Sequence, residues 1–407
     1  MVSIYMLDFN IMRIAIIVLI AVFSSPTSYA QQIVGNYDAP STTTAGAVTY
    51  DLAGHSMSFT PYDPAIINYA ENGPMAIDSA GIIYSFYIVF DGVLALAFDP
   101  ANNYYSIHSS FEFPSGGNQH SRGMAFDDND VLHVLKSRSY WNSLWSPPTA
   151  ELYTVDTTPG YSDFSPDLVG VLPFTLDNDA EVTSLAFHDG RFYTYLSPGG
   201  LVAINPNNAD SYLLTPDLQN ATQMSPEMAK VRGLCISNSG VFYASFHPLL
   251  HPNARDNFPH IVIIDPETGA LSYINEYVPR YDASTGLAFV EGPDDPLALW
   301  AGGTTGNTPL GPLHVKGNGV APGDQVAVYY TLDLTAAPAI IPAGMPGAGT
   351  QLNIGGTLRY LGTATANPDG QYRLPTGGVN KSFRNKILFQ GVNLANSKTT
   401  NFFRVIM

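Results

Sequence analysis

Five segments along the chain share one hydrophobic pattern, in which a small residue separates two large apolar residues. Alternation along a strand places the two large side chains on one face of a sheet and the small one on the other. The small residues lie 49, 61, 49 and 53 residues apart, which is the length of a four-stranded β-propeller blade. The segments are Met75-Ala76-Ile77, Met124-Ala125-Phe126, Leu185-Ala186-Phe187, Leu234-Cys235-Ile236 and Leu287-Ala288-Phe289.

A second apolar run follows each segment after a turn-rich gap. These runs begin at residues 83, 132, 192, 242 and 299, and each predicts the second strand of a blade. His133 and Trp300 fall in a column otherwise held by Tyr84, Tyr193 and Tyr243, so a structural role is expected for both. Asp and Asn in the turns set hairpins through local hydrogen bonds, although the stretch 127–130 has a weak capacity for calcium.

The order of the half-copies predicts how the ring closes. Residues 48–52 and 56–60 resemble the second half of a blade that arrives before any first half. The final first half, residues 285–301, is followed by no second half. Joining the two would complete a blade and leave no open sheet edge. The five repeated segments favour five blades, and weaker copies of the repeat would leave six or seven blades as alternatives.

The repeated hydrophobic pattern ends near residue 304. Alternating strands between Gly, Pro and Asp turns predict a small antiparallel β-sandwich over residues 305–407. It is similar to the immunoglobulin-like modules appended to exported bacterial proteins. The sequence therefore predicts an all-β chain, with a β-propeller over residues 31–304 and an immunoglobulin-like sandwich after it.

The first thirty residues read as a signal peptide. An apolar run over residues 14–23 follows Arg13, and Ser28-Tyr29-Ala30 is a small-x-small cleavage site. The run is shorter than the roughly 20 residues that a bilayer span needs. We expect cleavage near Ala30, no membrane span, and a secreted protein that is extracellular or periplasmic. Cys235 is the only cysteine, which excludes an internal disulfide framework.

The charge balance narrows the class of partner. The formal net charge is −17, which keeps the protein soluble and repels nucleic acid. The Gly/Pro/Tyr-rich composition, with 13% charged residues, is typical of a turn-rich β protein. Nucleic acid is therefore excluded as a partner.

One stretch carries a family resemblance. Residues 232–244, with the sequence RGLCISNSGVFYA, resemble repeats of NHL-type and lactonase-type β-propellers in secreted bacterial proteins. The resemblance covers roughly residues 45–303 and implies a fold more than a function. Lactonase-type members bind a divalent metal through a Glu and several Asn or Asp residues. No corresponding set of metal ligands is identified in this sequence, so the resemblance does not predict lactonase chemistry for it.

Two long insertions are expected on one face of the propeller, where binding loops commonly lie. The first, residues 136–150, contains Tyr140, Trp141 and Trp145. Exposed aromatic rings offer flat apolar surfaces to a sugar ring or a partner protein. The alternative is that both indoles fold back and cover the propeller rim.

The second insertion, residues 247–260, contains three of the nine histidines. His247, His251 and His260, with Asp256, are weak candidates for a divalent metal site. Their spacing matches no zinc signature, and Pro248 and Pro252 exclude a helical pair of histidines. A proline-stiffened loop is the favoured interpretation, and no cofactor is predicted.

Two arginines immediately precede inner strands. Arg122 and Arg232 are expected at the mouth of the central channel, on the face that carries the insertions. There they could bind a carboxylate, sulfate or phosphate. Ion pairs with Glu71, Glu181 or Asp282 are an equal alternative.

The sequence favours an exported binding or interaction protein whose propeller funnel takes a glycan, a small anion or a protein partner. Arg122, Arg232, Tyr140, Trp141 and Trp145 are its predicted ligand-binding residues. One alternative is a secreted hydrolase or lyase acting on a polysaccharide or lactone, and another is a structural component of an envelope or matrix. No GxSxG, Walker, GxGxxG or HExxH motif is present, so an enzyme is the less favoured class.

Overall fold

The structure, a computed structural model, describes residues 32–37, 46–52, 56–61, 74–89, 92–99, 104–111, 119–138, 150–157, 166–173, 181–182, 184–197, 200–215, 229–248, 260–274, 286–290, 297–302, 313–334, 337–377 and 387–405. Their regular secondary structure is entirely β-strand. None of them belongs to a helix of the length and apolarity that crossing a bilayer requires.

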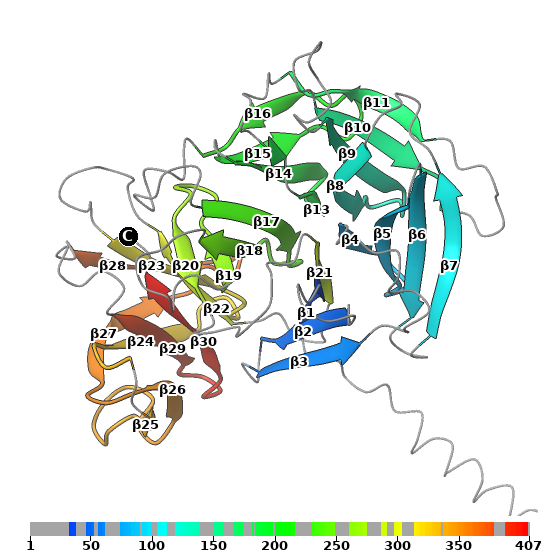
Figure 1. Ribbon diagram of the computed structural model, residues 1–407. Helices are drawn as coiled ribbons and strands as arrows, with labels where there is room; N and C mark the ends of the chain where they lie inside the picture. Colours follow the sequence, from blue (N-terminus) through cyan, green and yellow to red (C-terminus); the bar gives the residue numbers. More distant parts are fainter. Residues whose placement is uncertain are drawn as a thin grey trace, which may run out of the picture.

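Five antiparallel sheets surround a common centre in a propeller-like arrangement (Figure 1). Sheet 1 contains β4 (Met75–Ile77), β5 (Ile83–Val89), β6 (Gly92–Asp99) and β7 (Tyr104–Phe111). Sheet 2 contains β8 (Gln119–Phe126), β9 (Leu132–Arg138), β10 (Ala150–Val155) and β11 (Asp167–Val171). Sheet 3 contains β12 (Glu181–Val182), β13 (Ala186–His188), β14 (Arg191–Ser197), β15 (Gly200–Ile204) and β16 (Ser211–Leu213).

Sheet 4 contains β17 (Ala229–Ile236), β18 (Phe242–Pro248), β19 (His260–Ile264) and β20 (Leu271–Tyr273). Sheet 5 joins β21 (Leu287–Val290) to β1 (Gln32–Tyr37), β2 (Gly46–Asp51) and β3 (Ser56–Pro61). The inner strands neighbour one another in the order β4, β8, β13, β17 and β21, and β21 returns to β4. These are the five strands that the repeated triplets predicted.

Large side chains of the inner strands β8, β13, β17 and β21 pack against the small residue of the preceding sheet. Met124 and Phe126 share a buried cluster with Ala76 of sheet 1, and Leu185 shares another with Ala125 of sheet 2. The same relation joins sheets 3 and 4 through Ala186, and sheets 4 and 5 through Cys235. Small residues are needed because neighbouring sheets converge most closely near the centre. Cys235 therefore serves as a packed small residue and is 4% exposed.

An aromatic pair recurs between successive sheets. Its first member belongs to the column that contains His133, which confirms a structural position for this histidine. The ring centroids are 5.1 Å apart for Tyr84 and Phe126, 4.5 Å for His133 and Phe192, 5.0 Å for Tyr193 and Phe242, and 5.7 Å for Tyr243 and Phe289.

Sheet 5 corrects the predicted closure. The N-terminal segment does join the last inner strand, but it supplies three strands, and β1 pairs with β21 directly, with Val34 opposite Ala288. The prediction that residues 299–301 form the second strand of that blade is wrong. These residues belong to β22 (Ala298–Gly302), which pairs with β23 (Leu313–Asn318). The position beside β21 is already filled by β1, so β22 adds to another sheet.

The remaining strands form the C-terminal part. β22 and β23 form a sheet with β28 (Tyr372–Gly377). β30 (Thr399–Val405), β29 (Leu388–Asn393), β24 (Gln325–Thr331) and β27 (Arg359–Thr365) form a second sheet, which continues sheet 4 through pairing of β20 with β30. β25 (Pro338–Ile340) and β26 (Gln351–Gly355) form a hairpin.

The second of these sheets is buried on both faces. Val326 and Val328 of β24 belong to a large cluster that also contains residues of sheets 4 and 5. Ala327 and Tyr329, which alternate with them, pack with Leu352 and Ile354 of the hairpin. The C-terminal part therefore shares a continuous core with sheets 4 and 5 of the ring.

A buried ion pair holds the two parts together. Lys316 Nζ lies 2.9 Å and 3.2 Å from the two carboxylate oxygens of Asp265, which belongs to the turn after β19. Trp300 Nε1 donates to Asp265 at 3.4 Å, which gives Trp300 a structural role in the contact. Within the C-terminal part, the Asn401 side chain of β30 accepts the Leu299 N–H at 2.8 Å and donates to the Leu299 C=O at 2.9 Å, which ties β30 to β22.

Candidate functional site

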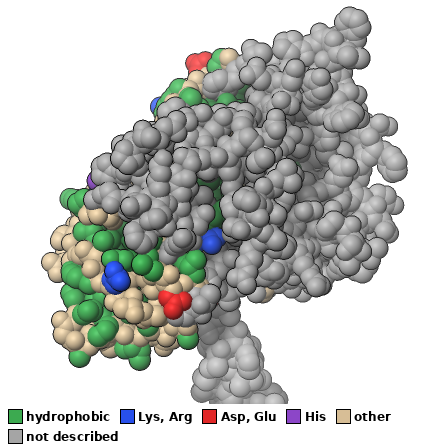
Figure 2. All heavy atoms as spheres, turned by 60° about the vertical axis from the view of Figure 1, so that its left-hand side comes forward, with side chains coloured by type: hydrophobic (Ala, Val, Ile, Leu, Met, Phe, Trp, Pro, Cys, Tyr) green, Lys and Arg blue, Asp and Glu red, His purple; other side chains and the backbone are tan. Residues whose placement is uncertain are grey.

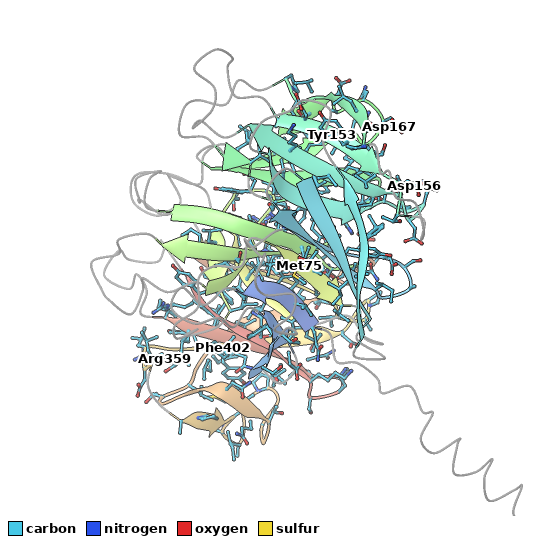
Figure 3. The ribbon with its side chains drawn as sticks, turned by 45° about the vertical axis from the view of Figure 1, so that its right-hand side comes forward. Met75, Tyr153, Asp156, Asp167, Arg359 and Phe402 are labelled. Atoms are coloured by element: carbon cyan, nitrogen blue, oxygen red, sulfur yellow. The ribbon has the colours of Figure 1, made fainter. Side chains whose placement is uncertain are left out.

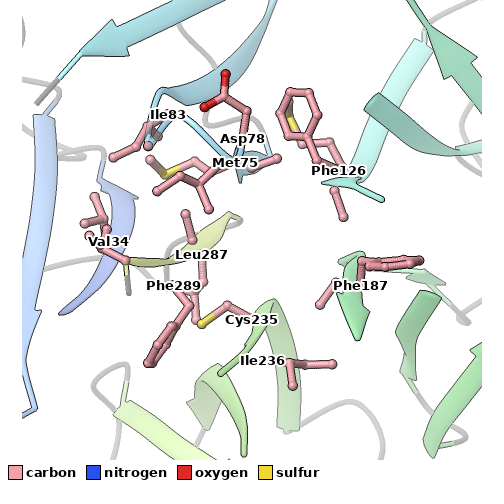
Figure 4. A pocket seen from close by; sticks show the side chains of 18 of the residues that line it. Val34, Met75, Asp78, Ile83, Phe126, Phe187, Cys235, Ile236, Leu287 and Phe289 are labelled. Carbon is pink, nitrogen blue, oxygen red and sulfur yellow. The ribbon is translucent and has the colours of Figure 1, made fainter. Parts of the chain in front are cut away.

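The five inner strands enclose a cavity of about 720 Å³ (Figure 4). Its wall is formed by the repeated triplets, and strands β1 and β2 contribute Gln32, Val34 and Thr49. Met75, on the first inner strand, lies near the centre of the sheets in Figure 3. The same repeats that build the ring therefore build a mostly apolar cavity along its axis.

One end of the cavity is acidic. The turns after β4 and β8 place Asp78, Asp127, Asp128 and Asp130 among the lining residues, and Asn238 comes from the equivalent turn of sheet 4. No Lys, Arg or His belongs to the described lining. Asp128 and Asp130 are exposed, whereas Asp78 and Asp127 are half-buried. The chemistry of this end therefore favours a positively charged or hydrogen-bond-donating group.

Three of the turns at this end use one hydrogen bond. A side-chain oxygen at the first turn position accepts the N–H four residues later, which fixes the hairpin as the Asp-rich sequence predicted. The donor–acceptor pairs are Ile82 to Asp78 at 2.8 Å, Val131 to Asp127 at 3.0 Å, and Val241 to Ser237 at 3.0 Å.

A further contact joins the turns of sheets 1 and 2. The Ser79 N–H donates to Asp130 Oδ1 at 2.9 Å, and the Ser79 hydroxyl donates to the other carboxylate oxygen. The acidic end is thus held across two sheets. Asp78, Asp127 and Asp130 each use carboxylate oxygens to hold backbone or hydroxyl groups in place.

Burial and these carboxylates shift the pKa of nearby groups. Desolvation, and then Asp78 and Asp130, raise the pKa of Tyr84 to about 12. Burial lowers the pKa of His133 below its ordinary 6.5, although its contact with Asp127 at 3.3 Å opposes the shift. Burial also lowers the pKa of His188, against the opposing effect of Asp189 and Asp128. Tyr84 and His133 are therefore uncharged at neutral pH.

The pH dependence of stability provides a test of the His133 environment. Because the unfolded state binds a proton more readily than buried His133, the free energy of unfolding should fall as pH drops below about 6.5. One such group contributes at most about 1.4 kcal/mol per pH unit. In His133→Tyr, which introduces the residue that three other repeats have at this position, the loss of stability between pH 7.5 and 5.5 should be smaller. Urea unfolding at both pH values measures it.

His133→Phe is the matched control for that variant. It also removes the titrating ring, but it cannot hydrogen-bond to Asp127. The Phe variant should lose the same pH dependence and be less stable than the Tyr variant at pH 7.5. An unchanged pH dependence in both variants would show that His133 does not cause it.

The predicted arginines lie on two inner strands at equivalent irregularities. The register of β8 with β9 shifts between Ser121 and Gly123, so Arg122 occupies a β-bulge. The register of β17 with β18 shifts between Val231 and Gly233, which places Arg232 in the same way. Both bulges precede the strand segments that line the cavity, at the end away from the acidic turns. Bulges commonly redirect a side chain near a functional site.

The glycine after each bulge permits close approach of the next sheet. A Cβ at Gly123 would lie 2.3 Å from the backbone N of Leu185 in sheet 3. A Cβ at Gly233 would lie 2.8 Å from Leu287 Cγ in sheet 5. Each Arg-Gly pair therefore combines a β-bulge with close approach of a neighbouring sheet.

The structure gives less information on the predicted aromatic residues and metal ligands. Tyr140, Trp141, Trp145, His251 and Asp256 lie outside the described residues. The two remaining metal candidates lie on adjacent strands: His247 in β18 and His260 in β19, where His260 is opposite Phe246. A group of three His, Cys, Asp or Glu side chains suited to a metal ion does not occur in the described part of the chain.

The acidic end of the cavity was not predicted as a site. The sequence showed Asp127, Asp128 and Asp130 as turn residues with weak calcium capacity, and Asp78 was not singled out. The available signal was their position directly after the inner triplets. Residues placed there necessarily surround one end of the channel once the ring forms.

Comparison with known proteins identifies no family. No model of a protein family matches the sequence, and no curated protein matches it. Solved structures do match. A protein from Lactobacillus plantarum is 12% identical, with 64% of this chain and 99% of that chain covered and a TM-score of 0.37.

Two further solved structures also match with low sequence identity and a low TM-score. The calcium-binding protein regucalcin from Agrobacterium tumefaciens is 11% identical, with 70% and 80% of the chains covered and a TM-score of 0.35. The Malassezia sympodialis allergen Mala s 1 is 9% identical, with 76% and 93% covered and a TM-score of 0.32. These TM-scores are below 0.5, and the chain's own strand pairing is what shows an all-β, propeller-like protein.

Proposed function

We propose that this chain is an exported binding protein whose central cavity takes a small ligand with an apolar body and a cationic group. The proposal includes a five-bladed propeller formed by sheets 1–5 and an immunoglobulin-like C-terminal sandwich. In this proposal the propeller ends and the sandwich begins between β21 and β22, which is earlier than the boundary at residue 304 that the sequence predicted. Residues 1–30 are proposed as its signal peptide.

The cavity carries the proposal. Pockets for small molecules typically enclose about 300–1,000 Å³ and combine apolar walls with a few fixed polar groups. The volume of about 720 Å³ lies within that range. Side chains such as Met75, Met124 and Phe126 supply apolar surface, and the turns supply carboxylates at one end. The turns are held by hydrogen bonds across sheets, so binding would require little reorganisation.

The charge of the lining changes the expected ligand. A small anion was predicted on the basis of Arg122 and Arg232, but the described lining contains four Asp residues and no basic side chain. The acidic end would repel an anion. Contact between Arg122, Arg232, Tyr140, Trp141 and Trp145 and a glycan, anion or partner at the opposite mouth remains a separate proposal.

A matched set of ring compounds tests the cavity. Benzyltrimethylammonium, benzyl alcohol and benzoate share a phenyl ring and differ in charge. We expect binding in the order cation, neutral compound, anion, measured by isothermal titration calorimetry and saturation-transfer NMR. Asp128→Lys should weaken cation binding by roughly fivefold or more, because it replaces an attraction of about 1 kcal/mol with a repulsion.

Asp167→Lys is the matched control. Asp167 is equally an exposed carboxylate, but it lies on β11 at the outer part of sheet 2, away from the cavity (Figure 3). It should leave cation binding unchanged. Equal effects of the two substitutions would show binding driven by overall charge, and binding of none of the three compounds would remove the cavity as a site for ligands of this class.

The carboxylates favour binding over hydrolysis. A glycosidase needs two carboxyl groups available to the substrate. Here Asp78 accepts two backbone N–H groups, Asp127 accepts two more, and Asp130 is bonded to Ser79. Turnover of a polysaccharide or lactone that disappears in Asp128→Asn would instead favour the hydrolase alternative.

A further inference from the structure

The interface between sheets 5 and 1 has aliphatic side chains where the other four interfaces have an aromatic pair. In those four, the first ring belongs to the residue opposite the small residue of the triplet, as Tyr243 lies opposite Cys235. The equivalent position of sheet 5 holds Val34, opposite Ala288. An aliphatic side chain therefore replaces the first ring of the pair.

The second ring of the pair is replaced as well. At the other four interfaces it is a phenylalanine, either the third residue of the triplet or the residue opposite that one on the second strand. Sheet 1 has Ile77 and Ile83 at these two positions, and they lie opposite each other. Isoleucine therefore stands at both positions that carry the second ring elsewhere.

The alternation of side chains in sheet 5 shows which of them face sheet 1. Ile33 and Tyr50 are buried in the cluster that sheet 5 shares with sheet 4. Val34 and Thr49 are their neighbours in the chain and lie opposite each other on β1 and β2. Because successive side chains of a strand point to opposite faces, Val34 and Thr49 face away from sheet 4 and toward sheet 1.

The cavity extends into this interface. Ile83 faces sheet 5, because Tyr84, the next residue of β5, packs in the cluster that sheet 1 shares with sheet 2. Figure 4 shows Val34 and Ile83 on the same side of the cavity. Outside the triplets and the turns that follow them, the described lining residues all belong to sheets 5 and 1: Gln32, Val34, Thr49, Ile83 and Val290.

We propose that the part of the cavity bordered by Val34, Thr49 and Ile83 is a subsite for an aromatic ring of the ligand. This inference rests on the proposed function and names the ligand class as an arylalkyl amine or ammonium compound. Its ring lies between sheets 5 and 1, and its cationic group lies at the acidic turns. The ligand thus supplies the aromatic group that this interface lacks.

Two observations support an aromatic group in this subsite. Flat rings occupy the equivalent place at the four other interfaces, with centroids between 4.5 Å and 5.7 Å apart. A carboxylate also borders the subsite, because Asp78 lines the cavity and accepts the N–H of Ile82, the residue before Ile83, at 2.8 Å. A ring beside Ile83 therefore has an anionic partner within reach of a short alkyl ammonium group.

The size of the cavity is sufficient for this arrangement. An apolar cavity of about 150 Å³ is enough to bind benzene. The cavity here has about 720 Å³, which leaves room for the cationic group as well. Contact of the ring with the aliphatic walls removes apolar surface from water and stabilises the complex.

Two cations that differ only in the ring test the subsite. Benzyltrimethylammonium should bind the wild-type protein roughly tenfold or more tightly than tetramethylammonium, because burial of an aromatic ring is favourable by at least that factor. Val34→Tyr introduces the residue that three other repeats have at this position and fills the subsite. It should remove the preference for the ring compound and leave tetramethylammonium binding unchanged, both measured by isothermal titration calorimetry.

Val171→Tyr is the matched control. It is the same substitution at an exposed valine of β11, where the side chain is 48% exposed and does not line the cavity. This variant should keep the tenfold preference for the ring compound. Thermal unfolding of both variants checks that they fold, and Val34→Tyr should not lower the Tm, because tyrosine fits this position in three other sheets.

An NMR measurement on the wild-type protein provides a readout that does not depend on any variant. Nuclear Overhauser effects from the ring protons of benzyltrimethylammonium should reach the methyl groups of Val34 and Ile83. The competing place for a ring is the outer surface of the C-terminal part, where exposed hydrophobic side chains are visible in Figure 2. Ile340, 63% exposed, reports contact there.

Three results would overturn the ring subsite. They are equal affinities for the two cations, a preference for the ring compound that survives in Val34→Tyr, and Overhauser effects to Ile340 in place of Val34 and Ile83. Each of them leaves the acidic end as a site for cations. Binding of neither cation would instead remove the proposed function together with the subsite.

Discussion

Replacing Lys316 with Met is expected to lower the free energy of unfolding by about 3–5 kcal/mol, the usual cost of leaving a buried charge without its partner. The Asp265 side chain is 1% exposed and that of Lys316 is 9% exposed. Without Lys316, the Asp265 carboxylate would remain among buried groups with Trp300 and Thr268 as its described hydrogen-bond donors. Urea or thermal unfolding at pH 7.5 measures the loss.

Two further variants separate burial from charge. Glu267 also contacts Lys316 Nζ, at 2.7 Å, but its side chain is 67% exposed, so Glu267→Gln should cost less than about 1 kcal/mol. Combining Lys316→Met with Asp265→Asn should recover part of the loss, because no buried charge is then left unpaired. Strictly additive losses would contradict the ion-pair account.

The C-terminal part should unfold together with the ring in the wild-type protein. Asp265 belongs to sheet 4, Lys316 to β23, and the surrounding core contains residues of both. A single unfolding transition is therefore expected, and weakening this contact should destabilise the ring as well. An immunoglobulin-like module appended through a flexible linker would instead unfold independently.

Substitution of Gly123 by Ala is expected to destabilise the protein by about 3 kcal/mol or more, at the upper end of overpacking effects. The added Cβ would lie 2.3 Å from the backbone N of Leu185 and the backbone C of Ser184. Because these atoms belong to the chain entering the next inner strand, relief requires movement of sheet 3 away from sheet 2. Thermal and urea unfolding would measure the loss.

Gly233→Ala is the matched control. The two glycines follow equivalent bulges, but the closest atom to a Cβ at Gly233 is a side-chain carbon, Leu287 Cγ, at 2.8 Å. A side chain can rotate where backbone cannot, so this variant should lose less, about 1–2 kcal/mol. Equal losses, or a smaller one for Gly123→Ala, would show that the sheets are less tightly joined than this packing indicates.

The site and the ring depend on the same residues. The triplets that pack between sheets also line the cavity, and the turns that follow them carry its carboxylates. Substitutions within the triplets would therefore alter folding and binding together. Exposed lining residues such as Asp128 are the suitable positions for testing the ligand, since their packing role is small.

Much of the ring could be predicted from local patterns. A small residue at a fixed place in each repeat reflects the close approach of neighbouring sheets, and Ala125 and Cys235 occupy that place as expected. Asp127 and Ser237 could likewise be identified as turn residues, because their hydrogen bonds reach only four residues along the chain.

The closure of the ring could be predicted only in part. Residues 299–301 resemble a second blade strand because Leu299, Trp300 and Ala301 repeat the apolar pattern, yet β22 pairs with β23. β1 takes the position beside β21, although its sequence QIVGNY repeats nothing elsewhere. The segments of β1 and β22 are both suited to pair with the edge of β21, and β1 lies about 250 residues before it in the chain. The local sequence does not show which of the two pairs there.

By itself, the sequence determined that this is an all-β chain with five equivalent inner strands, because period-two alternation and repeat length follow from backbone geometry. Only the tertiary structure decided which distant segments share a surface. It brought four carboxylates to one end of a cavity, buried Lys316 against Asp265, and merged the C-terminal strands with sheet 4. These are contacts between residues far apart in the chain, whose free energies depend on packing and burial that no single segment encodes.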